Sequence, residues 1–324
     1  MNWLLSIIYL VVFPGILFVL GFAFFAEWLD RKVYARVQRR VGPPFLQPLA
    51  DFIKLSSKED VVPEKADNAI FTAAPIISLA AILAAFLYVP VVTATALHVF
   101  EGDLIVALYL LTIPTLALFL GGWFSGNLFG QSGAMRVASL LFSYEVPFFL
   151  ALLAPALMAG TWSMSGIVVY LYGNPLAFVV TIGAFFIAVI SLQGKLERLP
   201  FDIPDAETEI VGGPMSEYSG RRLALFRLAR DAEMVVGAGL IAAVFLGGPW
   251  CPFISLDPGY IAWAVGAAFF ILKTLIVLGL LILMKSAVAR IRVDQMVNVA
   301  YKYLIPLALA QMLVVVLVKY MGWF

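Results

Sequence analysis

Eight long apolar runs dominate the 324-residue chain and limit the folds open to it. They occupy residues 3–26, 69–92, 104–123, 137–159, 177–193, 223–246, 261–284 and 303–320. A helix needs roughly 20 apolar residues to cross the hydrocarbon core of a bilayer. Because backbone amides in lipid must be bonded within their own segment, such runs form helices. The sequence predicts an all-α, polytopic integral membrane protein of the cell (inner/plasma) membrane, with residues 1–324 forming a single membrane domain.

The positive charges of the connections predict the orientation of these helices. Connections 27–68, 124–136, 194–222 and 285–302 carry eight, one, four and four Lys or Arg residues, whereas 93–103, 160–176 and 247–260 carry none. Cytoplasmic loops of membrane proteins are enriched in Lys and Arg. We therefore expect the charged connections in the cytoplasm and both termini outside. The first run follows Met-Asn and ends in charge, which predicts a retained span and not a signal peptide.

The most unusual stretch is the connection 193–234, which combines acidic and basic residues between two apolar runs. Residues 193–233 hold eight of the twenty acidic residues of the chain. Charges beside a bilayer are costly unless they face water, protein or each other. We expect Asp202 to cap a short helix carrying Glu207 and Glu209, and Ser219 to cap the following span. Capping accounts for only part of the acidic content, so the segment is the first candidate for function.

The first charged connection, 27–68, is expected to form a platform on the membrane surface. Residues 27–41 combine a stripe of Leu29, Val33 and Val37 with basic residues, which is typical of an amphipathic surface helix. Gly42-Pro43-Pro44 ends it, and a second short amphipathic helix follows over 48–58. Two interpretations stay open for the first helix: a topological anchor, or a docking surface for an extrinsic subunit. The docking candidates are Asp30, Arg31, Arg36, Arg39 and Arg40.

Two ionisable residues fall inside apolar runs. Glu145 lies about nine residues into the fourth run, and Lys273 lies twelve residues from the outer end of the seventh. Ionisable residues at such depth mark functional sites by default, and we expect an acidic partner for Lys273 or loss of its proton. With the carboxylates of the central connection they predict a buried polar route for ions. The alternative is a purely structural set of ion pairs.

Several kinds of site are excluded from this chain by its composition. Cys251 is the only cysteine and His98 the only histidine, and both lie in connections expected outside. One thiol holds neither a disulfide nor an iron–sulfur cluster. We expect no metal site and no cofactor in this chain, so any redox chemistry belongs to partner subunits.

Motifs in three connections resemble the heel membrane subunit of respiratory complex I, called the H subunit, or subunit 1 in mitochondria. The central connection contains Arg198-Leu-Pro-Phe-Asp202, Asp205-Ala-Glu207-Thr-Glu209 and Glu217-Tyr-Ser-Gly220. The first has Gln38-Arg-Arg40-Val-Gly-Pro43, and the last has Arg290, Arg292 and Asp294-Gln295. The likeness covers nearly the whole chain, and it implies eight spans with both termini outside.

The same family includes quinone-independent complexes. Two departures from the quinone-type pattern point toward that branch, and two further ones argue against a quinone-headgroup channel. The segment between Gly42-Pro43 and Gln47-Pro48 lacks the longer insert expected in quinone-type members, and Gly213-Pro214 replaces a Gly-aromatic step. Lys195 stands where a glutamate is expected, with Glu197 as its possible substitute, and Arg230 stands where an acid is expected, with Asp231 beside it. The chain is most similar to the membrane subunit of a group 4 energy-converting nickel–iron hydrogenase or of a membrane-bound sulfur-reducing complex.

The resemblance implies an oxidoreductase subunit that holds no redox centre and couples electron transfer to proton or sodium translocation. Its implied partners are a hydrophilic small subunit with a 4Fe–4S cluster, a large catalytic subunit that in hydrogenases holds a nickel–iron centre, and antiporter-like membrane subunits. The coupling candidates are Glu145, Asp202, Glu207, Glu209, Glu217, Asp231, Glu233 and Lys273. Their expected charge partners are Glu197, Arg198, Arg221, Arg222 and Arg230.

Three other functions stay open on the sequence alone. One is the quinone-binding membrane subunit of a respiratory oxidoreductase that takes electrons from NADH or a reduced deazaflavin. A stand-alone secondary transporter is disfavoured because no internal repeat or paired broken helix is visible. A passive membrane anchor leaves Glu145 and Lys273 unexplained.

Overall fold

The computed structural model describes residues 9–250 and 260–321, without the side chains of residues 207, 208, 260 and 261. Within these ranges every regular element is helical. The elements are α2 (Ile16–Val37), α3 (Gln47–Ser56), α4 (Asn68–Phe86), α5 (Asp103–Trp123), α6 (Leu128–Ala159), α7 (Met164–Gly173), α8 (Ala177–Lys195), α9 (Glu207–Ile210), the 3-10 turn η1 (Gly213–Met215), α10 (Gly220–Leu246), α11 (Tyr260–Ala287), α12 (Val293–Asn298), the π-helical η2 (Val299–Leu304) and α13 (Ile305–Tyr320).

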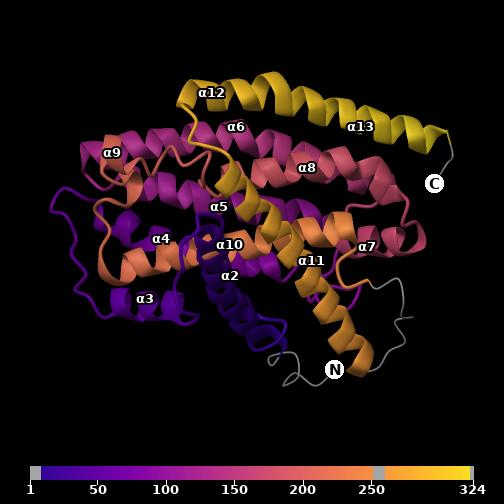
Figure 1. Ribbon diagram of the computed structural model, residues 1–324, viewed down its shortest axis with the longest axis horizontal. Helices are drawn as coiled ribbons and strands as arrows, with labels where there is room; N and C mark the ends of the chain where they lie inside the picture. Colours follow the sequence, from indigo (N-terminus) through magenta and orange to yellow (C-terminus); the bar gives the residue numbers. More distant parts are fainter. Residues whose placement is uncertain (1–8, 251–259, 322–324) are drawn as a thin grey trace.

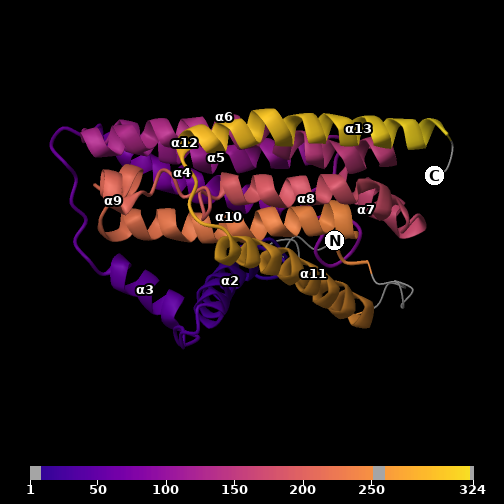
Figure 2. The same cartoon turned by 45° about the horizontal axis from the view of Figure 1, so that its top comes forward.

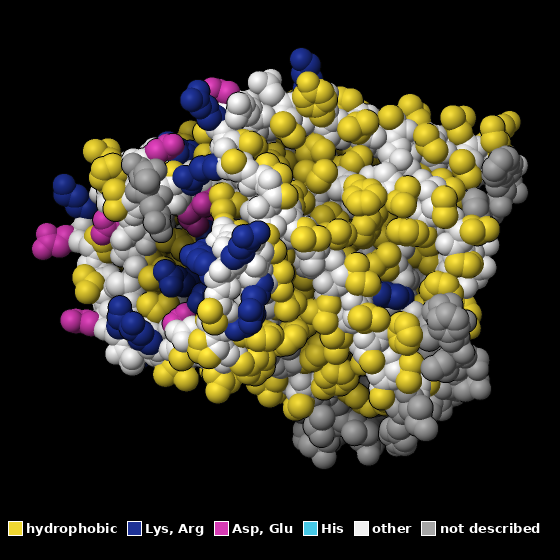
Figure 3. All heavy atoms as spheres, in the orientation of Figure 1, with side chains coloured by type: hydrophobic (Ala, Val, Ile, Leu, Met, Phe, Trp, Pro, Cys, Tyr) yellow, Lys and Arg dark blue, Asp and Glu magenta, His cyan; other side chains and the backbone are white. Residues whose placement is uncertain are grey.

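The long helices form one bundle whose axis lies horizontal in Figure 1. Helices α5, α6, α8, α10 and α13 run lengthwise, while α2 and α11 lean across them (Figures 1 and 2). The short helices α3 and α9 lie at one end and α7 lies at the other (Figure 1). Lys, Arg, Asp and Glu side chains gather over the end that carries α3 and α9, and the rest of this face is mainly apolar (Figure 3).

The all-α, polytopic prediction is confirmed. Among the described residues, seven helices are long and apolar enough to cross a membrane. The remaining predicted span, 223–246, corresponds to α10, whose last 18 residues still include the charged Arg230, Asp231 and Glu233. Every residue from Ala232 to Phe245 is buried, so this part of α10 lies inside the bundle. The assignment of the charged end to the cytoplasm stays a prediction.

Small residues allow α10 to occupy this central position. It packs against α2, α4, α8 and α11. A Cβ atom on Gly237 would lie 2.5 Å from the Leu192 side chain of α8, and one on Gly239 would lie 3.0 Å from the Phe270 ring of α11. Small residues let membrane helices approach closely and gain van der Waals contact. The close packing therefore encloses residues 232–245 of α10, including Glu233, within protein.

The central connection is anchored on the bundle by an aromatic contact. The ring of Tyr218 stacks on Phe71 of α4 with centroids 4.0 Å apart, and its hydroxyl donates to the Phe71 carbonyl at 3.2 Å. Pro214 fits against Gly133 of α6, where a Cβ would lie 2.5 Å from the proline ring. These contacts hold the segment 196–219 over the end of the bundle.

Several predicted boundaries are wrong. Helix α2 continues to Val37, so residues 27–41 do not form a separate surface helix. Helix α6 begins at Leu128, nine residues before the predicted span, and the predicted connection 160–176 contains α7. The last helical segment begins at Val293, not at 303. The second amphipathic helix of the first connection is confirmed as α3.

The two predicted caps also differ from the structure. Ala206, not Asp202, occupies the N-cap position of α9, which is a single turn. Ser219 occupies the N-cap position of α10 as predicted, but its hydroxyl makes no capping bond and instead accepts a hydrogen bond from the Val61 amide at 3.0 Å. The Ser219 hydroxyl, which was expected to cap α10, therefore binds the first connection instead.

Candidate functional site

The guanidinium of Arg198 binds two acidic residues of α2 at the polar end of the bundle. It donates to Asp30 of α2 at 2.7 Å and to Glu27 of the same helix at 3.3 Å. Lys285 of α11 contacts the same Asp30 oxygen at 2.6 Å. Because Asp30 is 1% exposed, its charge is neutralised inside the protein by two cations. The Asp30 placement corrects its prediction as a surface docking residue.

Arg31 connects this cluster to the surface helix α3. Its guanidinium lies 2.5 Å from Glu27 and 2.7 Å from Asp51 of α3. Gln47 donates a further hydrogen bond to Asp51 at 2.8 Å. Of the five docking candidates, two therefore lie in the ion-pair network. The other three, Arg36, Arg39 and Arg40, lie at or just beyond the end of α2.

A second cluster forms around Arg230 of α10. One nitrogen lies 2.8 Å from Glu197, which is 4% exposed, and another binds Asp205. Burial raises the pKa of Glu197 to about 8; Arg230 opposes this rise, and the neighbouring Asp205, Glu233 and Asp202 add to it. One arginine is thus shared by two carboxylates, and Glu197 gains a proton affinity suited to exchange near neutral pH.

An open cleft of about 280 Å³ lies between these two clusters. Its lining is made almost entirely of charged side chains, namely Glu27, Arg31, Glu197, Arg198, Asp202, Asp205, Arg227, Arg230, Asp231 and Lys285, with Leu199. The numbers of acidic and basic residues in this lining are equal. The cleft can therefore hold water and exchange protons without a large net charge.

Deeper in the bundle, Glu145 of α6 forms an ion pair with Lys195 at the end of α8. The ammonium lies 2.7 and 2.9 Å from the two carboxylate oxygens. It also lies over the Phe148 ring, 5.6 Å from the centroid. Glu233 of α10 lies beside both charges, is 5% exposed, and has an Oε1 atom without a hydrogen-bond partner among the described residues. Lys195 thus forms its ion pair with Glu145, and Glu233 lies within the electrostatic influence of that pair.

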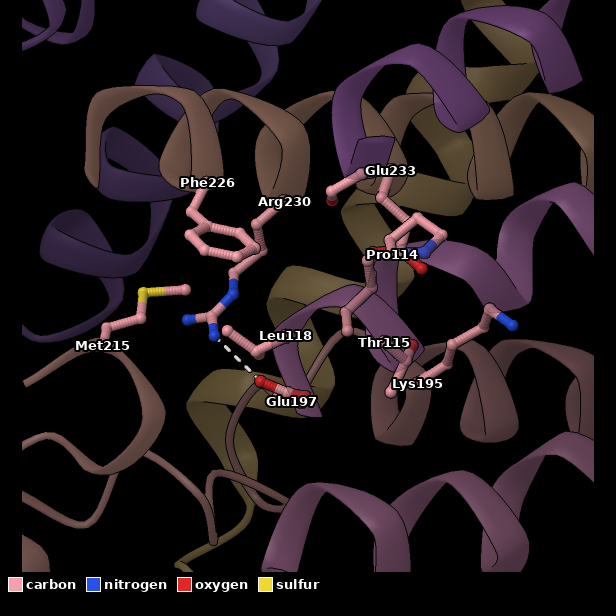
Figure 4. Close-up of a pocket in the computed structure, with 11 residues that line it drawn as sticks. Pro114, Thr115, Leu118, Lys195, Glu197, Met215, Phe226, Arg230 and Glu233 are labelled. Atoms are coloured by element: carbon pink, nitrogen blue, oxygen red, sulfur yellow. Dashed lines mark hydrogen bonds and ion pairs between the residues drawn. The ribbon is translucent and has the colours of Figure 1, made fainter. Parts of the chain in front are cut away.

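A small cavity lies between the Arg230 cluster and Glu233. It has a volume of about 20 Å³. Figure 4 shows the Arg230–Glu197 ion pair on one side and Glu233 on the other, with Thr115 of α5 among the lining residues. The polar residues of the site thus follow one another from the cleft toward the Glu145–Lys195 pair.

Other coupling candidates lie around this series. Asp202 forms an ion pair with Arg290 at 3.5 Å, Glu209 forms one with Arg136 of α6 at 2.6 Å, and Glu217 accepts a hydrogen bond from Asn127. Glu209 is largely exposed, and its hydrogen bond and ion pair with Arg136 lower its pKa. The side chain of Glu207 lies outside the described part of the chain.

The two remaining arginine candidates bind the first connection. Arg222 lies 3.3 Å from Asp60, and Arg221 donates to the Ser56 carbonyl at 3.4 Å. They therefore join the start of α10 to the end of α3 and to the segment that follows it. Neither residue lines the cleft or the small cavity.

Lys273 lies apart from the other buried charges. Its ammonium donates to the carbonyls of Leu246, Gly248 and Trp250 at 2.6, 3.0 and 2.7 Å. Leu246 ends α10 thirteen residues after Glu233, a distance of roughly 20 Å at 1.5 Å per residue. The described structure therefore places Lys273 at the far end of α10 from the carboxylate series.

Sequence reasoning missed the pairing of three residues. In the sequence, Lys195 stands out only as a departure from the family pattern, and Glu27 and Lys285 only as the ends of spans. Lys195 is 50 residues from Glu145, so no local spacing predicts the pair. The available signal is a lysine at the end of an apolar run, where burial of the cation requires a partner. Among the described residues, no group of three or more His, Cys, Asp or Glu side chains is arranged to hold a metal ion.

Comparisons with known proteins show the family to which this chain belongs. A family model described as NADH dehydrogenase matches residues 8–316. The chain is 34% identical to the H subunit of NADH-quinone oxidoreductase from Geobacillus thermodenitrificans, over 94% of this chain and 92% of that protein. It is 37% identical to the corresponding protein of Bacillus cereus (strain B4264), over 93% of this chain and 90% of that one.

A solved structure agrees with this family model and these relatives. A chain of the membrane-bound sulfane sulfur reductase, an archaeal respiratory membrane complex, superposes with a TM-score of 0.81 and 26% identity, covering 97% of this chain and 99% of that chain. Family, fold and the apolar helices agree on a multi-pass protein of the cell membrane. The chain therefore belongs to the NADH dehydrogenase family, together with the H subunits of NADH-quinone oxidoreductases, and is a membrane subunit of a redox complex.

Proposed function

We propose that this subunit couples electron transfer in a docked hydrophilic arm to translocation of protons or sodium ions. The observation that carries the proposal is the series of paired charges from the cleft to Glu145. Glu197 and Glu233 stand between the cleft and the Glu145–Lys195 pair. Buried ionisable residues in membrane proteins mark ion pathways, and purely structural packing does not require such a series.

Shared cations provide the physical basis for coupling. Arg230 is shared by Glu197 and Asp205, and Lys195 is close to Glu145 and Glu233. When two carboxylates compete for one cation, protonation of either changes the proton affinity of the other. A change of charge at the cleft, caused by electron transfer in the arm, would move a proton from Glu197 toward Glu233.

The lining of the cleft favours a quinone-independent complex. Sites for apolar rings and their tails are lined mainly by apolar and aromatic side chains. Leu199 is the only apolar residue among the described residues that line this cleft. Together with the short segment 42–48 and Gly213-Pro214, this favours a relative of the membrane-bound hydrogenases or sulfur-reducing complexes.

A quinone-binding subunit is the second candidate. It is favoured by the relatives, because several at 32–37% identity are named as the H subunit of NADH-quinone oxidoreductase. This function requires an apolar route from the bilayer to the cleft.

The basic residues at the polar end suggest how the complex is arranged. Arg39 and Arg40 are exposed, and α3 presents its own surface nearby. We place this end in the cytoplasm with both termini outside, where it docks a small subunit with a 4Fe–4S cluster and a large catalytic subunit. Antiporter-like membrane subunits would receive the charge displacement from Glu145.

The proposal is tested by purifying the native complex through a tag on this chain. We expect co-purified iron–sulfur subunits, and reduction of protons or sulfur species that continues when quinone-site inhibitors are added. About one nickel per complex would place it with the hydrogenases; cluster iron without nickel, with sulfur reduction, would place it with the sulfur reductases. Inhibitor-sensitive quinone reduction would establish the second candidate, and the absence of any iron–sulfur partner would overturn both.

A further inference from the structure

The small cavity between Glu197 and Glu233 has two hydroxyl-bearing residues in its lining. Ser78 of α4 and Thr115 of α5 line it together with Glu197 and Glu233. Both hydroxyl residues are buried, at 2% and 5% exposure. Neither residue belongs to the charged segments that the sequence indicates. Their position raises the question of what they bind.

The volume and the polar lining of the cavity indicate what kind of molecule it can bind. A cavity needs roughly 10–15 Å³ to hold a water molecule, together with two to four polar partners. This cavity offers about 20 Å³ and two hydroxyl-bearing residues. The partnerless Oε1 atom of Glu233 belongs to a residue that lines the same cavity. Buried polar atoms are normally hydrogen-bonded to protein or to ordered water.

Charge and size argue against a metal ion in this place. Lys195 and Arg230 also line the cavity and balance the charges of Glu197 and Glu233. A cation would face two positive groups within a space that accommodates one small neutral molecule. Water, which both donates and accepts hydrogen bonds, satisfies a carboxylate oxygen and two hydroxyl groups at once.

We propose that this cavity binds one water molecule, held by Ser78 and Thr115, that bridges Glu197 and Glu233. The inference rests on the proposed coupling function and supplies its middle step. The water gives one proton to Glu233 while it takes one from Glu197, so it leaves the step as water. Ser78 and Thr115 are positioning residues, since they orient the water and exchange no proton in net terms.

The direct test is a high-resolution cryo-EM map of the intact complex purified through this chain. We expect a density peak inside the cavity within hydrogen-bonding distance of the Thr115 hydroxyl and the Glu233 carboxylate. A dry cavity in a map that shows other buried waters would overturn the inference. This measurement needs no variant, so it is independent of folding defects.

Variants provide a functional test with a matched control. Thr115→Val combined with Ser78→Ala removes both hydroxyl groups and nearly preserves shape, and the rate of ion translocation should fall about tenfold. Thr112→Val makes the same chemical change on α5, at a residue whose hydroxyl donates to the Tyr109 carbonyl and which does not line the cavity. Infrared difference spectra add a separate readout, because the carboxyl band lost in Glu233→Gln should shift in the double variant and stay in place in the control.

The outcomes separate this inference from the proposed function. If Glu233→Gln stops translocation while the double variant leaves both rate and carboxyl band unchanged, the bridging water is wrong and the coupling function stands. If Glu233→Gln itself leaves translocation unchanged, the coupling function fails.

Discussion

The ammonium group of Lys195 lies 2.7 Å from the carboxylate of Glu145, and their side chains are 1% and 12% exposed. The two residues come from the end of α8 and from within α6, helices that pack against each other. This ion pair fixes a cation inside the bundle next to Glu233. The pair is the inner end of the carboxylate series that begins at the cleft.

Replacing Lys195 alone should destabilise the complex more than replacing Lys195 and Glu145 together. Lys195→Met leaves the Glu145 carboxylate buried without its cation, and breaking a buried pair costs about 3–5 kcal/mol. Adding Glu145→Gln should recover much of that loss, because no uncompensated charge remains. Thermal unfolding of the purified complex, followed for both single variants and the double variant, measures this coupling. Additive effects of the two substitutions would contradict the ion pair.

The spans could be predicted because a bilayer demands long apolar runs. The run 104–123 agrees with α5 to within one residue, and 177–193 agrees with α8 to within two. The continuation of α2 through Val37 could not be predicted in the same way, since charges after Glu27 look like the start of a surface helix. Within that continuation the buried Asp30 is neutralised by Arg198 and Lys285, which lie far along the chain and which no local pattern connects to it.

The sequence indicates which charged residues belong to the candidate site, but it does not indicate which of them form ion pairs. Glu197, Arg230 and Glu233 stand out in the sequence because charges between apolar runs are costly. Which carboxylate meets which cation depends on helix packing, and Ser78 and Thr115 carry no charge that would draw attention to them. Lys273 was expected with the other buried charges, yet the described structure places it at the opposite end of α10.

The raised pKa of Glu197 predicts a pH-dependent stability. Its pKa is about 8 in the folded protein against an ordinary value of 4.5, so between these values the folded state binds more protons than the unfolded state. Stability contributed by this group should therefore fall as pH rises from 4.5 to about 8. Glu197→Gln should flatten the profile of unfolding midpoint against pH. An identical slope in wild type and variant would contradict the raised pKa.

Glu209 should be dispensable for stability and for coupling. Its pKa is lowered by Arg136, so the small stabilisation by this pair is present above the ordinary carboxyl pKa and lost as pH falls. Because the side chain is 57% exposed, solvent screens the pair. Glu209→Gln should change the unfolding midpoint of the complex by less than about 2 °C. If Glu209→Gln instead abolished ion translocation while the complex still assembled, Glu209 would belong to the ion route.

Lys273 should stabilise the end of α10. Lys273→Met keeps the length of the side chain but leaves three backbone carbonyls without this donor, at a cost of about 1–3 kcal/mol. Lys319→Met is the matched control, because Lys319 is exposed and donates to one carbonyl, that of Leu157. Differential scanning calorimetry of both variants should show a lower unfolding midpoint for Lys273→Met only. Equal midpoints for the two variants would contradict this role.

The proposed coupling is measured most directly by the number of ions that the intact complex translocates per electron in proteoliposomes. We compare wild type, Glu233→Gln and Glu209→Gln, with electron transfer measured in the same vesicles. We expect that Glu233→Gln assembles and transfers electrons but translocates almost no ions, while Glu209→Gln behaves as wild type. An unchanged ratio of ions to electrons in Glu233→Gln would contradict the carboxylate route.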